Sequence, residues 1–148
     1  MRLDIEPPYA GWAKVRLTAE GVRLEFVASY VPYDSIGDLA RAAVDLLTGL
    51  PEQVVSWNTE PMEYDFRFAT AGGRTCLQVH QYPDGRRRWR RAEVPVATVE
   101  GDTISIARAI WRGLRRLQGA VSAEAFATVW RGPFPAAAVE RIGDLLRG

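Results

Sequence analysis

Apolar and polar residues alternate along much of the first two thirds of the chain, and this two-residue period predicts antiparallel strands. Residues 12–17 and 22–29 alternate on either side of the turn at 19–21, which predicts a hairpin. A second group is expected to form a three- or four-stranded meander, and its strand-like stretches are 53–59, 64–69 and 75–80. Residues 1–11 contain Pro7 and Pro8 and predict only an extended lead-in.

The end of the meander carries a strong turn signal. Pro83-Asp84-Gly85 favours a tight type I′ hairpin turn. Residues 86–96 are expected to return from it as an edge strand, because they are rich in arginine and contain Pro95.

A helical period separates the two groups of strands and returns in the last third of the chain. Residues 36–47 predict an amphipathic helix that ends at Gly49 and Pro51. Asp34 or Ser35 is placed to cap it, and Ser35 with Asp38 resembles a capping box. The later helices are expected to begin at Asp102, after Ser122 and at Pro135; the first has an apolar stripe that includes Ile106, Ile110, Leu114 and Leu117, widened by Ile104, and ends at Gly119.

These elements predict one α+β domain over residues 1–148. Its antiparallel sheet is expected to have about five to six strands, built as a hairpin, a helix and a meander. The C-terminal helices should pack on one face of the sheet and leave the other face partly exposed.

Charge is distributed unevenly along the chain. Residues 1–65 carry 11 acidic and 5 basic side chains, a net charge of −6, whereas residues 66–148 carry 7 acidic and 14 basic side chains, a net charge of +7. Such asymmetry can mark an electrostatic surface for a partner. The alternative is that the two halves neutralise each other within the fold or in a dimer.

The candidate catalytic chemistry is sparse. With one histidine, His80, and one cysteine, Cys76, the sequence excludes a histidine-rich zinc site and an internal disulfide. It also has no nucleophile elbow, phosphate-binding loop or dinucleotide fingerprint. An acidic group at Glu60, Glu63 and Asp65 could bind a hard cation, although a charged hairpin turn is the ordinary explanation. We therefore expect no enzymatic activity, no catalytic residues, no metal and no cofactor.

Two sets of residues are candidates for binding. A non-catalytic module that binds a protein partner, or a second copy of itself, would use aromatic and arginine side chains. The residues of this set are Tyr30, Tyr33, Trp57, Trp89, Arg87 and Arg91. The alternative is binding of nucleic acid or another polyanion through the arginines of residues 86–91 and of the helix after Asp102. The residues of that set are Arg86, Arg88, Arg90, Arg108, Arg112 and Arg115.

The N-terminal residues lack the apolar core of a signal peptide, and no apolar run approaches the length of a membrane span. We therefore expect a cytoplasmic protein without a membrane partner.

Several motifs spread over the chain resemble a family of small bacterial proteins with no assigned activity. They are ASYxxxD at 28–34, a DLxxA…LLxG helix at 38–49, EPxEYxF at 60–66 and WxxPFP at 130–135. The resemblance covers most of the chain and implies no catalytic residues. In size and style such proteins also resemble immunity partners of toxins, which implies a regulatory or immunity-like role.

Overall fold

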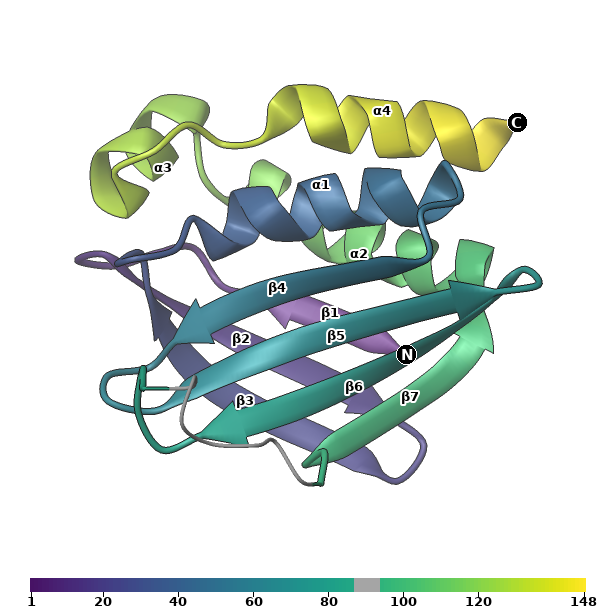
Figure 1. The fold of residues 1–148 in the computed structure, drawn as a ribbon. Helices are drawn as coiled ribbons and strands as arrows, with labels where there is room; N and C mark the ends of the chain where they lie inside the picture. The colour runs from purple at the N-terminus through teal and green to yellow at the C-terminus, as the bar shows by residue number, and fades with distance from the viewer. Residues whose placement is uncertain (87–93) are drawn as a thin grey trace.

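The computed structural model describes residues 1–86 and 94–148, and these residues form an α+β fold (Figure 1). Seven strands make one antiparallel sheet in which the strand order follows the chain. The strands are β1 (Arg2–Ile5), β2 (Trp12–Ala19), β3 (Val22–Ser29), β4 (Glu52–Asn58), β5 (Glu63–Ala71), β6 (Arg74–Tyr82) and β7 (Ala97–Asp102). The helices are α1 (Ser35–Leu47), α2 (Thr103–Ala120), α3 (Ala123–Trp130) and α4 (Ala136–Arg147).

The sheet is folded over on itself. Neighbouring strands pair along most of their length, except that β3 and β4 share only the pair Ser29–Asn58. Pro32 and the following helix α1 interrupt the chain at this point, so the two strands diverge beyond the shared pair. As a result β1–β3 lie behind β4–β7 (Figure 1).

Aromatic side chains fill the space between the two halves of the sheet. The ring of Phe26 on β3 stacks on Tyr64 of β5, with ring centroids 4.6 Å apart. Phe26 also meets Trp57 and Phe66 edge-on, at 5.6 and 6.1 Å. Because large aromatic rings bury much apolar surface, this cluster contributes strongly to the stability of the folded-over sheet.

Asp34, one of the two expected caps, caps the N-terminus of helix α1, and the expected capping box of Ser35 with Asp38 does not form. The Asp34 carboxylate accepts a hydrogen bond from the backbone N–H of Gly37 and a second one, 3.0 Å long, from Nε1 of Trp130. Ser35 is buried and donates to the backbone carbonyl of Ser56. The cap therefore ties α1 to α3, while Ser35 ties α1 to β4.

Helix α2 covers the outer edge of β1, and α1 packs against both α2 and α4. Helix and strand lie very close together at Gly113, where a Cβ atom would be only 2.4 Å from the carbonyl oxygen of Leu3. The Arg116 guanidinium donates to the same carbonyl at 2.8 Å. Backbone groups on the open edge of β1 thus meet a helix instead of solvent.

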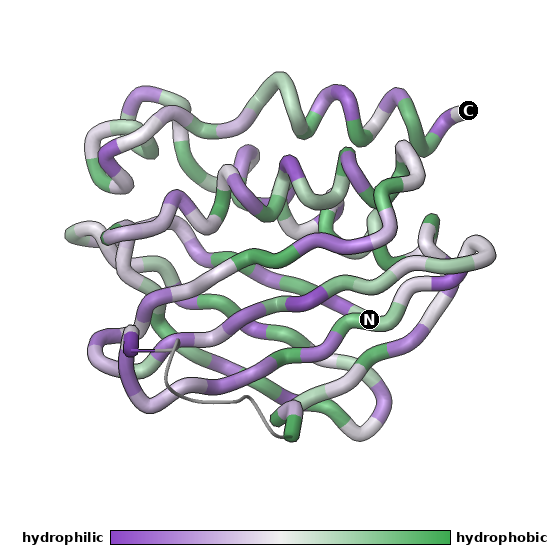
Figure 2. The backbone as a smooth tube through the Cα atoms, viewed as in Figure 1, coloured by the Kyte–Doolittle hydropathy of each residue, from purple (hydrophilic) through white to green (hydrophobic). Residues whose placement is uncertain are grey.

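The alternation used to place the strands is visible as green and purple steps along them (Figure 2). The α+β class, the antiparallel sheet and the C-terminal helices are confirmed, and the strand count is seven rather than five to six. The lead-in contains strand β1, which the sequence did not predict. None of the described helices is both long and apolar enough to cross a membrane.

The expected tight type I′ turn after β6 is wrong, because neither Asp84 nor Gly85 has a positive φ, although β6 and β7 do pair antiparallel. Strand β7 begins at Ala97, so residues 83–96 join it to β6, and the residues 94–96 of the expected edge strand lie outside β7. The Asp84 carboxylate accepts a 2.9 Å hydrogen bond from the backbone N–H of Arg86, which is a side-chain turn and not a two-residue hairpin. Most of the expected edge strand, residues 87–93, lies outside the described residues.

Replacing Gly113 with alanine tests the contact between α2 and β1. In an ordinary helix this change stabilises, by up to about 1 kcal/mol. Here the methyl group would collide with the Leu3 carbonyl, so we expect Gly113→Ala to lower the free energy of unfolding by about 1–3 kcal/mol. Gly119→Ala is the matched control, since nothing lies near its added methyl group, and it should be neutral or stabilising. Denaturant unfolding of both variants measures the difference, and equal stability of the two would contradict the contact.

Candidate functional site

Several connections meet at one end of the molecule, on the left of Figure 1. The turn between β1 and β2 presents Tyr9, which is 84% exposed. The backbone N–H of Tyr9 donates to the carbonyl of Trp12, and the N–H of Trp12 donates back to the Tyr9 carbonyl, at 2.8 and 2.9 Å. Ala10 and Gly11 between them have φ of 50° and 83°, as a type I′ turn requires. The exposed ring is therefore carried on a well-defined turn.

Tyr30 lies beside this turn. Its backbone N–H donates to the carbonyl of Gly11, and its ring occupies the place where a Gly11 side chain would be. On another side the ring meets Trp130 edge-on and the Arg131 guanidinium, which is 5.1 Å from the ring centroid. With the exposed Val31 next in the chain, Tyr9, Tyr30 and Arg131 form a surface that we call the tyrosine end.

Strained backbone is concentrated in the same region. Three described residues other than glycine have a positive φ: Ala10, Glu60 and Arg131. They lie in the β1–β2 turn, the β4–β5 turn and the end of α3, which are all at this end of the molecule (Figure 1). Arg131 has φ 57° and ψ 38°, the left-handed position at a helix end that glycine usually occupies.

Two other predicted partner residues are not surface anchors. Trp57 is fully buried in the aromatic cluster with Phe26 and Phe66, so its prediction as a binding residue is wrong. Its alternation with polar neighbours on β4 directs it to the inner face of the sheet. Tyr33 is half-buried, and its hydroxyl donates to the carboxylate of Glu63 at 3.2 Å.

The outer face of the sheet carries a row of buried polar side chains. Glu63, Asp65 and His80 are only 4%, 3% and 7% exposed. We expected Glu60, Glu63 and Asp65 to form a charged turn, but only Glu60 of the three is exposed. Asp65 lies opposite His80 in the β5–β6 pairing, accepts a 2.8 Å hydrogen bond from Ser56 and has the Arg67 guanidinium 3.6 Å away.

His80 is the group in this row with titration chemistry near neutral pH. Burial, and next the positive charge of Arg67, hold its pKa below the usual value of 6.5, while Asp65 acts in the opposite direction. Its Nε2 lies 3.2 Å from the amide oxygen of Gln78, and its buried Nδ1 has no hydrogen-bond partner among the described residues. Burial and the charge of Arg67 therefore favour the neutral form of the imidazole.

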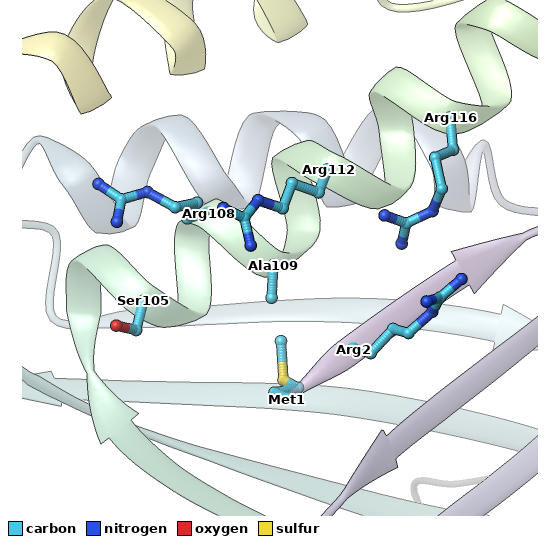
Figure 3. Close-up of a pocket in the computed structure, with 7 residues that line it drawn as sticks. All are labelled: Met1, Arg2, Ser105, Arg108, Ala109, Arg112 and Arg116. Atoms are coloured by element: carbon cyan, nitrogen blue, oxygen red, sulfur yellow. The ribbon is translucent and has the colours of Figure 1, made fainter.

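The predicted polyanion set does not form one surface. Arg108 and Arg112 lie together in a groove between β1 and α2, with Arg2 and Arg116 (Figure 3). Arg115 faces α4 and bonds to Gln118 instead. Arg86 follows the Tyr82 end of β6, whereas α2 starts beside the opposite end of that strand, where Arg74 pairs with Asp102.

The remaining predicted binding residues lie outside the described part of the chain. They are Arg87, Arg88, Trp89, Arg90 and Arg91. Within residues 1–86 and 94–148, no group of three or more histidine, cysteine, aspartate or glutamate side chains could hold a metal ion.

Sequence reasoning missed two participants in these surfaces. Tyr9 could have been found as an apolar residue placed directly before the Ala10-Gly11 turn, where few neighbours can bury it. Arg2 could not have been found in this way, because its proximity to α2 depends on contacts between residues more than 100 positions apart. Comparison of the chain with protein-family models, curated proteins and solved structures finds no match.

The low pKa of His80 predicts how stability depends on pH. The unfolded chain binds a proton at His80 more readily than the folded protein does. The contribution of the neutral His80 to the free energy of unfolding is therefore fully present above pH 6.5 and is lost as the pH falls below that value. We expect His80→Gln to reduce the loss of unfolding free energy between about pH 7.5 and about pH 5.5. Urea unfolding of both proteins across this range gives the comparison. The opposite outcome, an equal or steeper loss in the variant, would mean that His80 is not the group responsible.

Removing the hydroxyl group of Tyr33, and that of Tyr30 as a control, tests the hydrogen bond to Glu63. Tyr33→Phe removes the donor to buried Glu63 and should lower the free energy of unfolding by about 1 kcal/mol. Tyr30→Phe removes a hydroxyl that has no hydrogen bond within the described chain, and should change it by less than about 0.5 kcal/mol. Thermal or denaturant unfolding distinguishes them, and a larger effect at Tyr30 would contradict the assignment.

Proposed function

We propose that this chain is a non-catalytic protein-binding module whose partner docks on the tyrosine end. The observation that carries the proposal is the exposed Tyr9 ring on its type I′ turn, beside the Tyr30–Arg131 stack. Tyrosine and arginine are the residue types that contribute most often to binding energy at protein interfaces. A ring held on a well-defined turn also loses little conformational freedom when it is bound.

The conformation of Arg131 supports the same surface. A left-handed conformation costs a non-glycine residue about 1 kcal/mol or more, and a glycine there would avoid that cost. The arginine side chain is positioned over Tyr30. Strained residues are often found at binding sites, because their side chains are used there. We infer that the side chain of Arg131 is kept for a partner.

The chemistry of this surface defines the kind of partner. Arg131 is exposed and forms no ion pair within residues 1–86 and 94–148, so its charge is open to a carboxylate. Tyr9 and Val31 beside it offer apolar contact. The proposed partner is therefore a protein with an acidic side chain next to an apolar patch.

A regulatory or immunity-like role, in which the module acts by occupying its partner, is part of this proposal. So is a cytoplasmic location, which the free thiol of Cys76 supports because such thiols are usual in reducing compartments. A homodimer through the same surface is the competing arrangement, and the experiment below includes it.

Arg131→Gly separates binding from folding. The change removes the guanidinium and relaxes the backbone, so we expect an unfolding free energy equal to or above that of the native protein, and binding weakened at least about tenfold. Partners captured with the native protein would be identified, purified and titrated against both proteins. Tyr9→Ser should weaken binding similarly, because it removes the exposed ring without touching the core.

Arg108→Gln is the control, since it removes an exposed arginine in the first half of α2, outside the tyrosine end, and should leave partner binding unchanged. Equal binding of native protein, Arg131→Gly and Tyr9→Ser would overturn the proposal. Sedimentation of the native protein alone tests the homodimer. If the native protein is a dimer and Tyr9→Ser dissociates it, the partner that docks on the tyrosine end is a second copy of the chain.

A further inference from the structure

The line along which α2 passes over β1 carries an arginine-lined groove of about 370 Å³ (Figure 3). We name it the arginine groove. Arg2 of β1 and Arg108, Arg112 and Arg116 of α2 line it, together with Met1, Ser105 and Ala109. It is a different surface from the tyrosine end and does not depend on the function proposed there.

The charges within the groove are not balanced. Asp4 bridges two of the four guanidiniums, with Arg2 at 2.6 Å and Arg116 at 2.9 Å. Among the residues that the structure describes, Arg108 and Arg112 have neither an ion pair nor a side-chain hydrogen bond. The side chains of these four arginines and Asp4 together carry a net charge of +3.

This arrangement costs stability in the absence of a ligand. Arg108, Arg112 and Arg116 are spaced four residues apart, so each neighbouring pair places like charges on one face of the helix. Asp4 shows what the groove accepts, because it is an oxyanion held by two guanidiniums. The hydrogen bond from Arg2 and the charge of Arg116 keep its pKa below the usual value, although burial opposes them, so it is ionised at pH 7.

The groove is also small. Its volume is within the range of small-molecule sites. Single-stranded nucleic acid requires a basic surface that follows several nucleotides, but Arg115 faces α4 and Arg86 lies beyond the other end of β6. The described arginines therefore do not extend the groove into such a track.

We propose that the arginine groove binds a small polyanion that carries two or more adjacent phosphate groups, with Arg108 and Arg112 as its main contacts. Arginine forks match phosphate oxygens in pairs, which gives both affinity and orientation. Asp4 acts as an internal competitor, since it occupies Arg2 and Arg116 when no ligand is present. The ligand either displaces it or binds beside it.

Calorimetric titration with inorganic tripolyphosphate, at low and at physiological salt, tests the proposal. Native protein should bind, and Arg108→Gln/Arg112→Gln should weaken binding by roughly tenfold or more. Arg115→Gln is the matched control on the same helix and should bind as the native protein does. Asp4→Asn should tighten binding, by roughly threefold or more, because it removes the competing anion.

Further ligands define the recognised group. Equal affinity for tripolyphosphate and a nucleoside triphosphate would identify the phosphates alone as the recognised group, and tighter binding of the nucleotide would add its base or sugar; both support the proposal. No binding of tripolyphosphate at low salt, or an equal loss in Arg115→Gln, would overturn it. So would tighter binding of a single-stranded oligonucleotide than of tripolyphosphate. Unchanged affinity in Asp4→Asn would overturn the role of Asp4 as a competitor.

Discussion

Packing of the Phe26 ring against Tyr64 is the contact on which the arrangement of this molecule depends. The halves β1–β3 and β4–β7 share a single residue pair, so backbone hydrogen bonds alone cannot hold them face to face. Phe26 crosses that gap and meets three aromatic rings of the opposite half. Once the halves face each other, α1 and α2 close the remaining open side (Figure 1).

Both proposed binding surfaces follow from this folding over of the sheet. The tyrosine end forms where connections from both halves and from α3 converge, which places Tyr30 between the Gly11 turn and Arg131. The arginine groove forms where α2 lies along the edge of the first half. Gly113 allows that approach, and Arg2 and Arg116 then share Asp4. Each surface therefore combines residues that are distant in sequence.

Local sequence patterns were sufficient to predict most of the fold, but they predicted little of the candidate site. Periods of two and of 3.6 residues identified β2–β6 and the four helices, because these elements bury one regular face. Strand β1 has only four residues and stands before Pro7-Pro8, so no period could be established. Asp34 rather than Ser35 caps α1 because of tertiary contacts that the sequence does not show: Trp130 donates a hydrogen bond to Asp34, and the Ser35 hydroxyl donates to the Ser56 carbonyl instead. Burial of Glu63 and Asp65 on the outer face likewise depends on what covers them. The alternation of apolar and polar residues along the strand does not predict such a cover.

Helix α2 covers the open edge of β1, and this affects how the chain behaves while it is being synthesised. Strand β1 leaves the ribosome before β2 and can pair with β2 as soon as that strand emerges, since the two are neighbours in sequence. Its other edge stays open until Gly113 and Arg116 have emerged, more than 100 residues later. During that interval the open edge can pair with a strand of another nascent chain. Completion of α2 is thus the step that ends exposure to aggregation at this edge.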